Sequence, residues 1–279
     1  MKTYLPNLII IGAPKCGTSS MHFYLGLHPQ IYMSQPKELN FFQIEKNWDK
    51  GEKWYRSHFK KQAIIRGESS PMYSNTFEFL GVPERMHALI PDARLIYLMR
   101  DPIERIISHH IHATAVGLSS GSIDECLNSP DNNYIQYSKY YTQLESYLKY
   151  YSLSQICMIT SEELYLERYQ TLKKVFCFLG VDSGYYSNQF TTLKNTYADI
   201  SPKSQFARYL DRMTNHNIRF IIPETIRSSK QKMIFSRFKD RVSKPILSNK
   251  LKKQLVNCLK DDINQLRALT NQKFEKWCL

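Results

Sequence analysis

Apolar residues along this chain occur in short continuous runs, separated by segments in which they recur at helical spacing. Four largely apolar runs predict buried strands, at residues 8–11, 63–68, 94–99 and 155–160. The segments between them predict helices at about 19–27, 83–90, 101–112, 140–151 and 172–179. Strands that alternate with helices indicate an α/β fold, with a mostly parallel sheet and helices on both of its faces. From residue 201 onward the pattern predicts helices and no clear strand.

Length and charge divide the chain into two parts. Its 279 residues suit one large domain, with a core over residues 1–200 and a helical extension over 201–279 packed on it. The extension carries 18 Lys and Arg against 6 Asp and Glu, whereas the core carries 20 against 19. Basic and apolar residues interleave at helical spacing in residues 251–260, which predicts an amphipathic packed helix rather than a disordered arm.

The cysteines and the hydropathy pattern favour a cytoplasmic protein. The six cysteines are scattered and form no C-x-x-C pair, so neither a zinc site nor a disulfide framework is indicated. No apolar run approaches the ~20 residues that a membrane-spanning helix needs. Pro6 and Asn7 interrupt the apolar patch near the start, which makes it a poor signal peptide. We therefore expect no membrane span.

A glycine-containing loop follows the first strand and is the most informative motif. Gly12 and Gly17 have the spacing of an ATP-binding P-loop, but Thr18 stands where such a loop has its lysine, and Lys15 lies inside the loop instead. A strand that leads through this loop into a helix amino end predicts an anion site, because the helix dipole and unpaired N–H groups face the ligand.

A second motif follows the strand at 94–99. Arg100 ends this strand, Asp101 can cap the next helix and Pro102 can occupy its first turn. Ser108 lies two turns along the same helix. An arginine and a hydroxyl placed in this way suit a phosphate group.

The two motifs together resemble those of the sulfotransferases that use 3′-phosphoadenosine-5′-phosphosulfate (PAPS), in particular the bacterial and heparan-type members. This resemblance implies a P-loop-like fold and a site for PAPS, with 3′,5′-ADP as product and no metal. Arg100 and Ser108 would bind the 3′-phosphate, and Lys15 would also stabilise the leaving phosphate. The residues implied to hold the 5′-phosphosulfate are Lys15, Cys16, Gly17, Thr18, Ser19 and Ser20.

A third segment, at residues 36–42, resembles the family's Lys-Glu-x-x-Phe-Phe pattern. It implies that Glu38 is the general base for the acceptor, because attack by a hydroxyl or amine needs a proton acceptor within reach. Lys37, beside it, would bind the acceptor. His22 is the alternative base, although its position on the first helix favours a packed or surface histidine. Asn40 stands where relatives often have histidine, so the acceptor pocket differs there.

Three further residues are implied by looser resemblances. Tyr73 belongs to a Gly-Glu-x-Ser-Pro-x-Tyr segment that starts at Gly67, and Tyr140 begins a helix rich in tyrosine. Tyr73 is predicted to contact the acceptor and Tyr140 the nucleotide or the acceptor, with core packing as the alternative for the tyrosines of that helix. Lys203 resembles a residue of a late loop that closes over PAPS.

For the acceptor, the sequence predicts only a class: a small natural product or a carbohydrate. We expect no nucleic-acid partner, since the basic residues of the extension are placed as in a packed helix. Two other classes stay open at this point: a P-loop-like nucleotide kinase, and a basic module that binds an anionic polymer. The missing P-loop lysine and the lack of an evident Mg²⁺-binding aspartate at a strand end disfavour the kinase.

Overall fold

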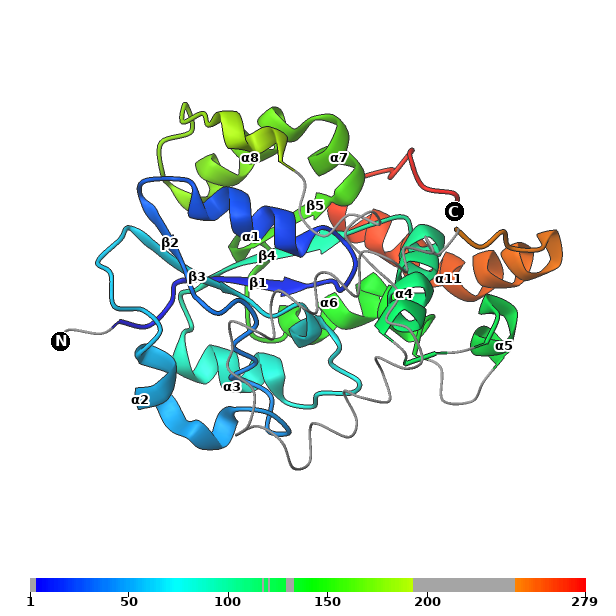
Figure 1. Ribbon diagram of the computed structural model, residues 1–279, viewed down its shortest axis with the longest axis horizontal. Coiled ribbons are helices and arrows are strands. Elements are labelled where there is room, and N and C mark those ends of the chain that lie inside the picture. The colour runs from blue at the N-terminus through cyan, green and yellow to red at the C-terminus, as the bar shows by residue number, and fades with distance from the viewer. Residues whose placement is uncertain (1–3, 117, 120, 129–132, 193–243) are drawn as a thin grey trace, which may run out of the picture.

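The computed structural model describes residues 4–116, 118–119, 121–128, 133–192 and 244–279. In these residues five parallel strands form one sheet in the order β2-β3-β1-β4-β5 (Figure 1). The strands are β1 (Leu8–Gly12), β2 (Ile31–Met33), β3 (Ile65–Ser69), β4 (Arg94–Met99) and β5 (Ile156–Thr160). The predicted α/β fold with a parallel sheet is thereby confirmed.

The central strands are apolar because helices cover both of their faces. Every residue of β1 is buried, and its neighbours β3 and β4 pair with it through parallel registers that set Ile9 beside Glu68 and Leu95. Gly12 ends β1 where no side chain fits: a Cβ there would lie 2.3 Å from the Ser74 hydroxyl oxygen. The chain must therefore leave β1 at a glycine, directly before the loop that contains Lys15.

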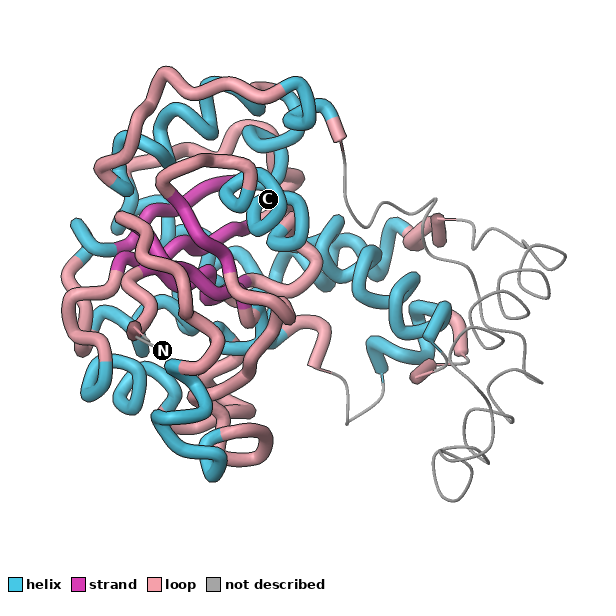
Figure 2. The backbone as a smooth tube through the Cα atoms, turned by 60° about the vertical axis from the view of Figure 1, so that its left-hand side comes forward, coloured by secondary structure: helices cyan, strands magenta, loops and turns pink. Residues whose placement is uncertain are grey.

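Helices lie on both faces of the sheet (Figures 1 and 2). Figure 1 shows α1, α7 and α8 on one face and α2, α3 and α6 on the other, while α4, α5 and α11 gather at one end of the sheet. The helices are α1 (Thr18–Gly26), α2 (Gly51–Arg56), α3 (Val82–Leu89), α4 (Pro102–Val116), α5 (Ile123–Asn128), α6 (Tyr140–Leu148), α7 (Ser161–Leu166), α8 (Arg168–Leu179) and α11 (Asn249–Thr270). Short 3-10 helices lie at η1 (Trp48–Lys50), η2 (Pro71–Ser74), η3 (Gln136–Ser138), η4 (Leu153–Gln155) and η5 (Asn188–Thr191).

Two hydrophobic clusters organise the interior. The larger surrounds the sheet, and the smaller joins α4, α5 and α11 through residues such as Ile106, Leu127 and Leu255. The helix α11 is amphipathic, as the sequence predicted for residues 251–260, and it packs on α6 and α4. Its buried Asp262 accepts hydrogen bonds from the N–H groups of Tyr141 and Thr142, at 3.0 and 2.9 Å, and so caps α6.

Candidate active site

The loop between β1 and α1 presents a helix amino end at the carboxyl edge of the sheet. Lys15 and Gly17 both have positive φ angles, 71° and 90°, in the left-handed region that favours glycine at position 17. Gly17 is the N-cap of α1, and no side-chain hydrogen bond caps this helix. Thr18 and Ser20 are buried and Ser19 is half-buried at the first turn. This amino end has the geometry of an anion site.

Lys15 connects the three predicted motifs electrostatically. Burial lowers the pKa of Lys15 to about 8; the thiol of Cys16 raises it, and the guanidinium groups of Arg100 and Arg105 lower it further. The carboxylate of Glu38 acts on the same pKa in the raising direction. The charges of Arg100 and Glu38 thus both act on Lys15, although the three residues lie far apart in the sequence.

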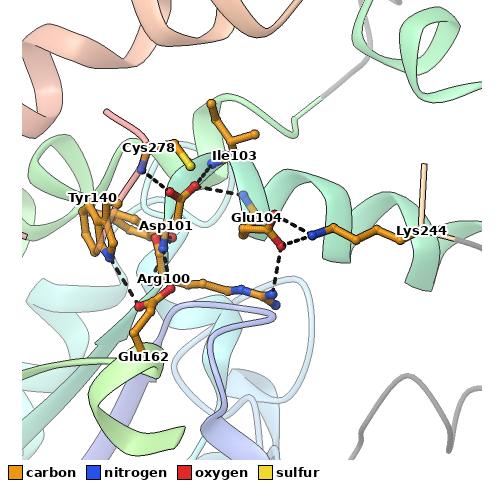
Figure 3. A network of polar contacts seen from close by, with 9 residues as sticks. Arg100, Asp101, Ile103, Glu104, Tyr140, Glu162, Lys244 and Cys278 are labelled. Atoms are coloured by element: carbon orange, nitrogen blue, oxygen red, sulfur yellow. Dashed lines mark hydrogen bonds and ion pairs between the residues drawn. The ribbon is translucent and has the colours of Figure 1, made fainter. Parts of the chain in front are cut away.

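Asp101 fixes the turn that follows Arg100. Its carboxylate accepts hydrogen bonds from the N–H groups of Ile103 and Glu104, at 2.9 and 3.0 Å, and so caps α4 as predicted. The guanidinium of Arg100 lies 3.3 Å from the carboxylate of Glu104, which Lys244 also contacts at 2.7 Å (Figure 3). Ser108 is buried two turns along α4.

The last residues of the chain brace the same turn. The second carboxylate oxygen of Asp101 accepts a hydrogen bond from the N–H group of Cys278 (Figure 3). The N–H group of Asp101 donates to Glu162 at 3.0 Å, and the indole of Trp277 donates to the other oxygen of Glu162 at 3.3 Å. The segment that contains Arg100 is thus tied to both α7 and the C-terminal tail.

Tyr140 and Tyr73 are interior residues, and their predicted contact with the acceptor, or for Tyr140 with the nucleotide, stays a prediction. Both side chains are fully buried. The hydroxyl of Tyr140 donates to the carbonyl of Arg100 at 2.8 Å and lies 3.6 Å from the sulfur of Cys16. Tyr140 therefore links the two cofactor motifs, while the hydroxyl of Tyr73 donates to the carboxylate of Glu68 at 2.9 Å. A tyrosine buries its ring while its hydroxyl finds a partner, so sequence alone does not separate this role from acceptor binding.

Cys16 makes contacts within the loop between β1 and α1. Its N–H group donates to the carbonyl of Ala13 at 3.2 Å, and its side chain is fully buried. Burial raises the pKa of its thiol to about 11, so the sulfur is neutral at physiological pH. The contact of Cys16 with the cofactor stays a prediction.

Glu38 lies on a loop that runs across from these residues. Its carboxylate is 48 % exposed and forms an ion pair with Lys37. Its N–H group donates to the carbonyl of Ser69 at 3.0 Å, and its φ of 66° is unusual for a residue other than glycine. Glu38 is thus accessible while its backbone is fixed. The alternative base, His22, is partly buried on α1, and burial followed by the charge of Lys37 lowers its pKa to about 4.

Two histidines on α4 face the same region and were not singled out from the sequence. Burial, then Arg105 and Lys15, lowers the pKa of His109 to about 3. Burial and Lys15 also lower the pKa of His112, while Glu38 acts in the raising direction. In a helix, residues three or four positions apart share one face, so His109 and His112 lie on the same face as Arg105. This helical spacing in the segment after Arg100 could have identified the two histidines from the sequence. Both imidazoles are therefore neutral neighbours of Lys15 at physiological pH.

Comparison with known proteins decides the family. The model of the sulfotransferase domain matches residues 5–234. The chain belongs to the sulfotransferase family. It is an enzyme of this class, whose members generally use PAPS. In the part of the chain that the structure describes, no helix is long and apolar enough to cross a membrane.

The relatives of this sulfotransferase include enzymes of heparan sulfate. The bifunctional heparan sulfate N-deacetylase/N-sulfotransferase 1 of Caenorhabditis elegans is 27 % identical over 76 % of this chain and 26 % of its own length. The heparan sulfate glucosamine 3-O-sulfotransferase 5 of Homo sapiens is 30 % identical over 63 % of this chain and 54 % of its own. The chain thus spans about a quarter to a half of the curated relatives it matches.

Solved structures show the same fold. A sulfotransferase from Alicyclobacillus acidocaldarius is similar over 98 % of this chain and 99 % of its own, with a TM-score of 0.71 and 22 % identity. The P-loop-like fold expected for this sulfotransferase is confirmed by this likeness. Lys203 lies outside the described residues. Among the residues that the structure does describe, no group of three metal-ligating side chains is close enough to hold an ion.

Proposed function

We propose that this sulfotransferase moves the sulfuryl group of PAPS to a hydroxyl or amine of a carbohydrate or small-molecule acceptor. The observation that supports this most is the convergence of Lys15, Arg100 and Glu38 at one site, seen in the electrostatic environment of Lys15. These are the residues implied for the leaving phosphate, the 3′-phosphate and the acceptor proton.

The residues present fit a polyanionic nucleotide. Lys15 is desolvated beside two guanidinium groups, those of Arg100 and Arg105, and like charges disfavour one another at such a site. An anion placed between them offsets that repulsion. The amino end of α1, which has no side-chain cap, adds backbone N–H groups that favour negative charge. PAPS carries one phosphate at the 3′ position and another at the 5′ position. Each phosphate would thus have its own cationic partner, Arg100 for the first and Lys15 for the second.

Each side chain then has a distinct task. PAPS, when bound, supplies the sulfuryl group, and 3′,5′-ADP is what remains. Lys15 stabilises the charge that builds on the phosphate as transfer proceeds. Glu38 accepts the proton of the attacking hydroxyl or amine. Arg100 and Ser108 hold the 3′-phosphate.

Two features support a carbohydrate as the acceptor class. The relatives named above act on heparan sulfate, and residues 201–279 are strongly basic, which suits an anionic polysaccharide. The same positive charge also suits the alternative function of a module that binds an anionic polymer. In an enzyme it would bind the anionic acceptor. The roles of Lys37 in acceptor binding and of Lys203 in closing over PAPS remain predictions, as does a cytoplasmic location.

Replacement of Glu38 by glutamine tests the proposed mechanism. Glutamine keeps the shape of the side chain and removes the proton acceptor. A general base contributes about 10²–10⁴-fold, so we expect sulfo transfer to an unsulfated polysaccharide of glucosamine and uronic acid, which is anionic through its carboxylates, to fall by that factor. Binding of 3′,5′-ADP should stay within about twofold, because Glu38 does not hold the nucleotide.

The matched control is Glu45→Gln, the same change at an exposed glutamate after the same loop. It should transfer at the wild-type rate. Sulfo transfer is followed as a mass gain of the acceptor, and nucleotide binding by calorimetry. Wild-type turnover in Glu38→Gln would remove the base from this position, and His112 would then be the first residue to replace.

A further inference from the structure

A carboxylate buried in the core lies directly beneath the Glu38 loop. Glu68, on β3, is fully buried. One of its oxygens accepts hydrogen bonds from the hydroxyls of Tyr55 and Tyr73, at 2.8 and 2.9 Å. The other accepts from the hydroxyl of Ser70 at 2.7 Å. The backbone N–H group of Leu39 is a further donor to it. All four partners are donors, and this set is complementary to an ionised carboxylate. Burial raises the pKa of Glu68, and these four hydrogen bonds act in the opposite direction.

The same hydroxyls also reach the loop. The hydroxyl of Tyr73 accepts a hydrogen bond from the N–H group of Phe42 at 3.3 Å. The hydroxyl of Ser70 accepts one from the N–H group of Asn40 at 3.0 Å. With the direct contact to Leu39, residues 39, 40 and 42 are all connected to Glu68 through no more than one hydroxyl.

This support is needed because the loop backbone is unfavourable on its own. Glu38 and Asn40 have φ angles of 66° and 48°, in the left-handed region where residues other than glycine are strained and persist only when their surroundings hold them. The amide of the Asn40 side chain also donates to the carbonyl of Glu38 at 3.0 Å. The direction in which the Glu38 side chain projects from the loop therefore depends on the contacts of the loop with the buried residues Glu68, Ser70 and Tyr73.

We infer that Glu68 is a positioning residue for Glu38: its carboxylate orders Tyr73 and Ser70, and through them it holds the loop that presents Glu38. This inference rests on the proposed role of Glu38. Glu68 does not touch the reacting groups, so its loss acts only through the loop. A displacement of about 1 Å at a reacting group costs on the order of 10²-fold in rate.

The test is a double-mutant cycle between Glu68→Gln and Glu38→Gln. In Glu68→Gln an amide NH₂ replaces one acceptor oxygen and faces donors, whereas the shape is kept. We expect the single change to lower kcat by about 10- to 100-fold and to leave the affinity for 3′,5′-ADP within about twofold. In the Glu38→Gln background the same change should have little further effect on kcat, because the group that Glu68 positions is already gone.

Tyr73→Phe is the second variant, for the case that Glu68→Gln does not fold. It removes one hydroxyl that bridges Glu68 and Phe42, and it should show the same dependence on Glu38. Its matched control is Tyr151→Phe, since Tyr151 is also buried but donates to the carbonyl of Ile90 at 3.2 Å, away from the loop. This control should change stability without changing kcat.

The possible outcomes separate the two ideas. If the effects of Glu68→Gln or Tyr73→Phe multiply in full with that of Glu38→Gln, the positioning role is overturned and the role of Glu38 stands. Unchanged kcat in folded Glu68→Gln overturns it as well. Wild-type turnover in Glu38→Gln alone rejects the role of Glu38 as base, and with it the positioning role of Glu68, while sulfo transfer by the enzyme stands.

Discussion

At the scale of single residues, the protonation of Lys15 is strongly affected by its surroundings. Its ammonium group is largely desolvated and has guanidinium neighbours, so its charge is weakly favoured before a ligand arrives. An anionic ligand favours the protonated form. Binding of an anionic nucleotide is therefore linked to the protonation of Lys15. Raising the pH above the pKa of about 8 removes the positive charge of Lys15 and so weakens binding.

We expect the affinity for 3′,5′-ADP to fall about tenfold between about pH 7 and about pH 9, as a group with a pKa of about 8 predicts. Calorimetry at the two pH values measures this change. Lys15→Arg is the control, because a guanidinium stays charged throughout the range. The variant should bind with little pH dependence. An equal fall in Lys15→Arg would assign the titration to another group.

At the scale of elements, the turn between β4 and α4 is the proposed site for the 3′-phosphate. The strand ends at Met99, Asp101 caps the helix, and Arg100 is held between them by Tyr140 on one side and Glu104 on the other. Because the backbone of Arg100 is fixed, its guanidinium starts from a defined place. Discrimination between nucleotides with and without a 3′-phosphate should therefore reside in this one side chain and Ser108.

We expect Arg100→Ala to weaken binding of 3′,5′-ADP by about 1.5–3 kcal/mol, the usual value of a hydrogen bond to a charged group, and to leave 5′-AMP binding unchanged. Thermal shifts with the two nucleotides, without Mg²⁺, report the difference. Arg56→Ala is the control, because Arg56 also pairs with a carboxylate four residues away, Glu52, but in α2. A parallel loss for both nucleotides in Arg100→Ala would contradict a specific 3′-phosphate contact.

The elements also show what could be predicted from the sequence. The apolar runs of β1 and β4, and the capping residue Asp101, gave strand, turn and helix in the right places because local pattern and burial agree there. β2 spans only Ile31–Met33, too short for a periodic signal. α7 was missed although Thr160 and Glu163 form a capping box. The roles of Lys15, Arg100 and Glu38 were available only from the resemblance and stay predictions, whereas the inferred role of Glu68 depends on hydroxyls from Tyr55 and Tyr73 that only the folded chain assembles.

At the scale of the whole molecule, α11 attaches the C-terminal part to the sheet through α6. Buried Asp262 accepts from two N–H groups of α6 and from the hydroxyl of Thr142, the last at 2.7 Å. α6 in turn begins with Tyr140, which contacts Arg100 and the loop of Lys15. The basic helix is thus structurally connected to the proposed cofactor site through α6.

We expect Asp262→Ala to lower the free energy of unfolding by about 1–3 kcal/mol, because two part-buried N–H groups and the hydroxyl of Thr142 lose their partner. Denaturant unfolding measures it. The neighbouring Asp261 is exposed, so Asp261→Ala should change stability by less than about 0.5 kcal/mol. Equal stability of the two variants would mean that Asp262 does not hold α11 on α6.

The burial of Cys16 has a consequence for how the protein meets oxidants. A thiol reacts as its thiolate, and reactivity follows both ionisation and exposure. Cys16 has neither, whereas Cys177 and Cys258 are exposed. Peroxide or an alkylating reagent therefore modifies the outer thiols first, on α8 and α11, and leaves the sulfur beside Lys15 unmodified. The loop keeps a cysteine at its centre without itself becoming sensitive to redox conditions, although the exposed Cys278 lies at the neighbouring Asp101 turn.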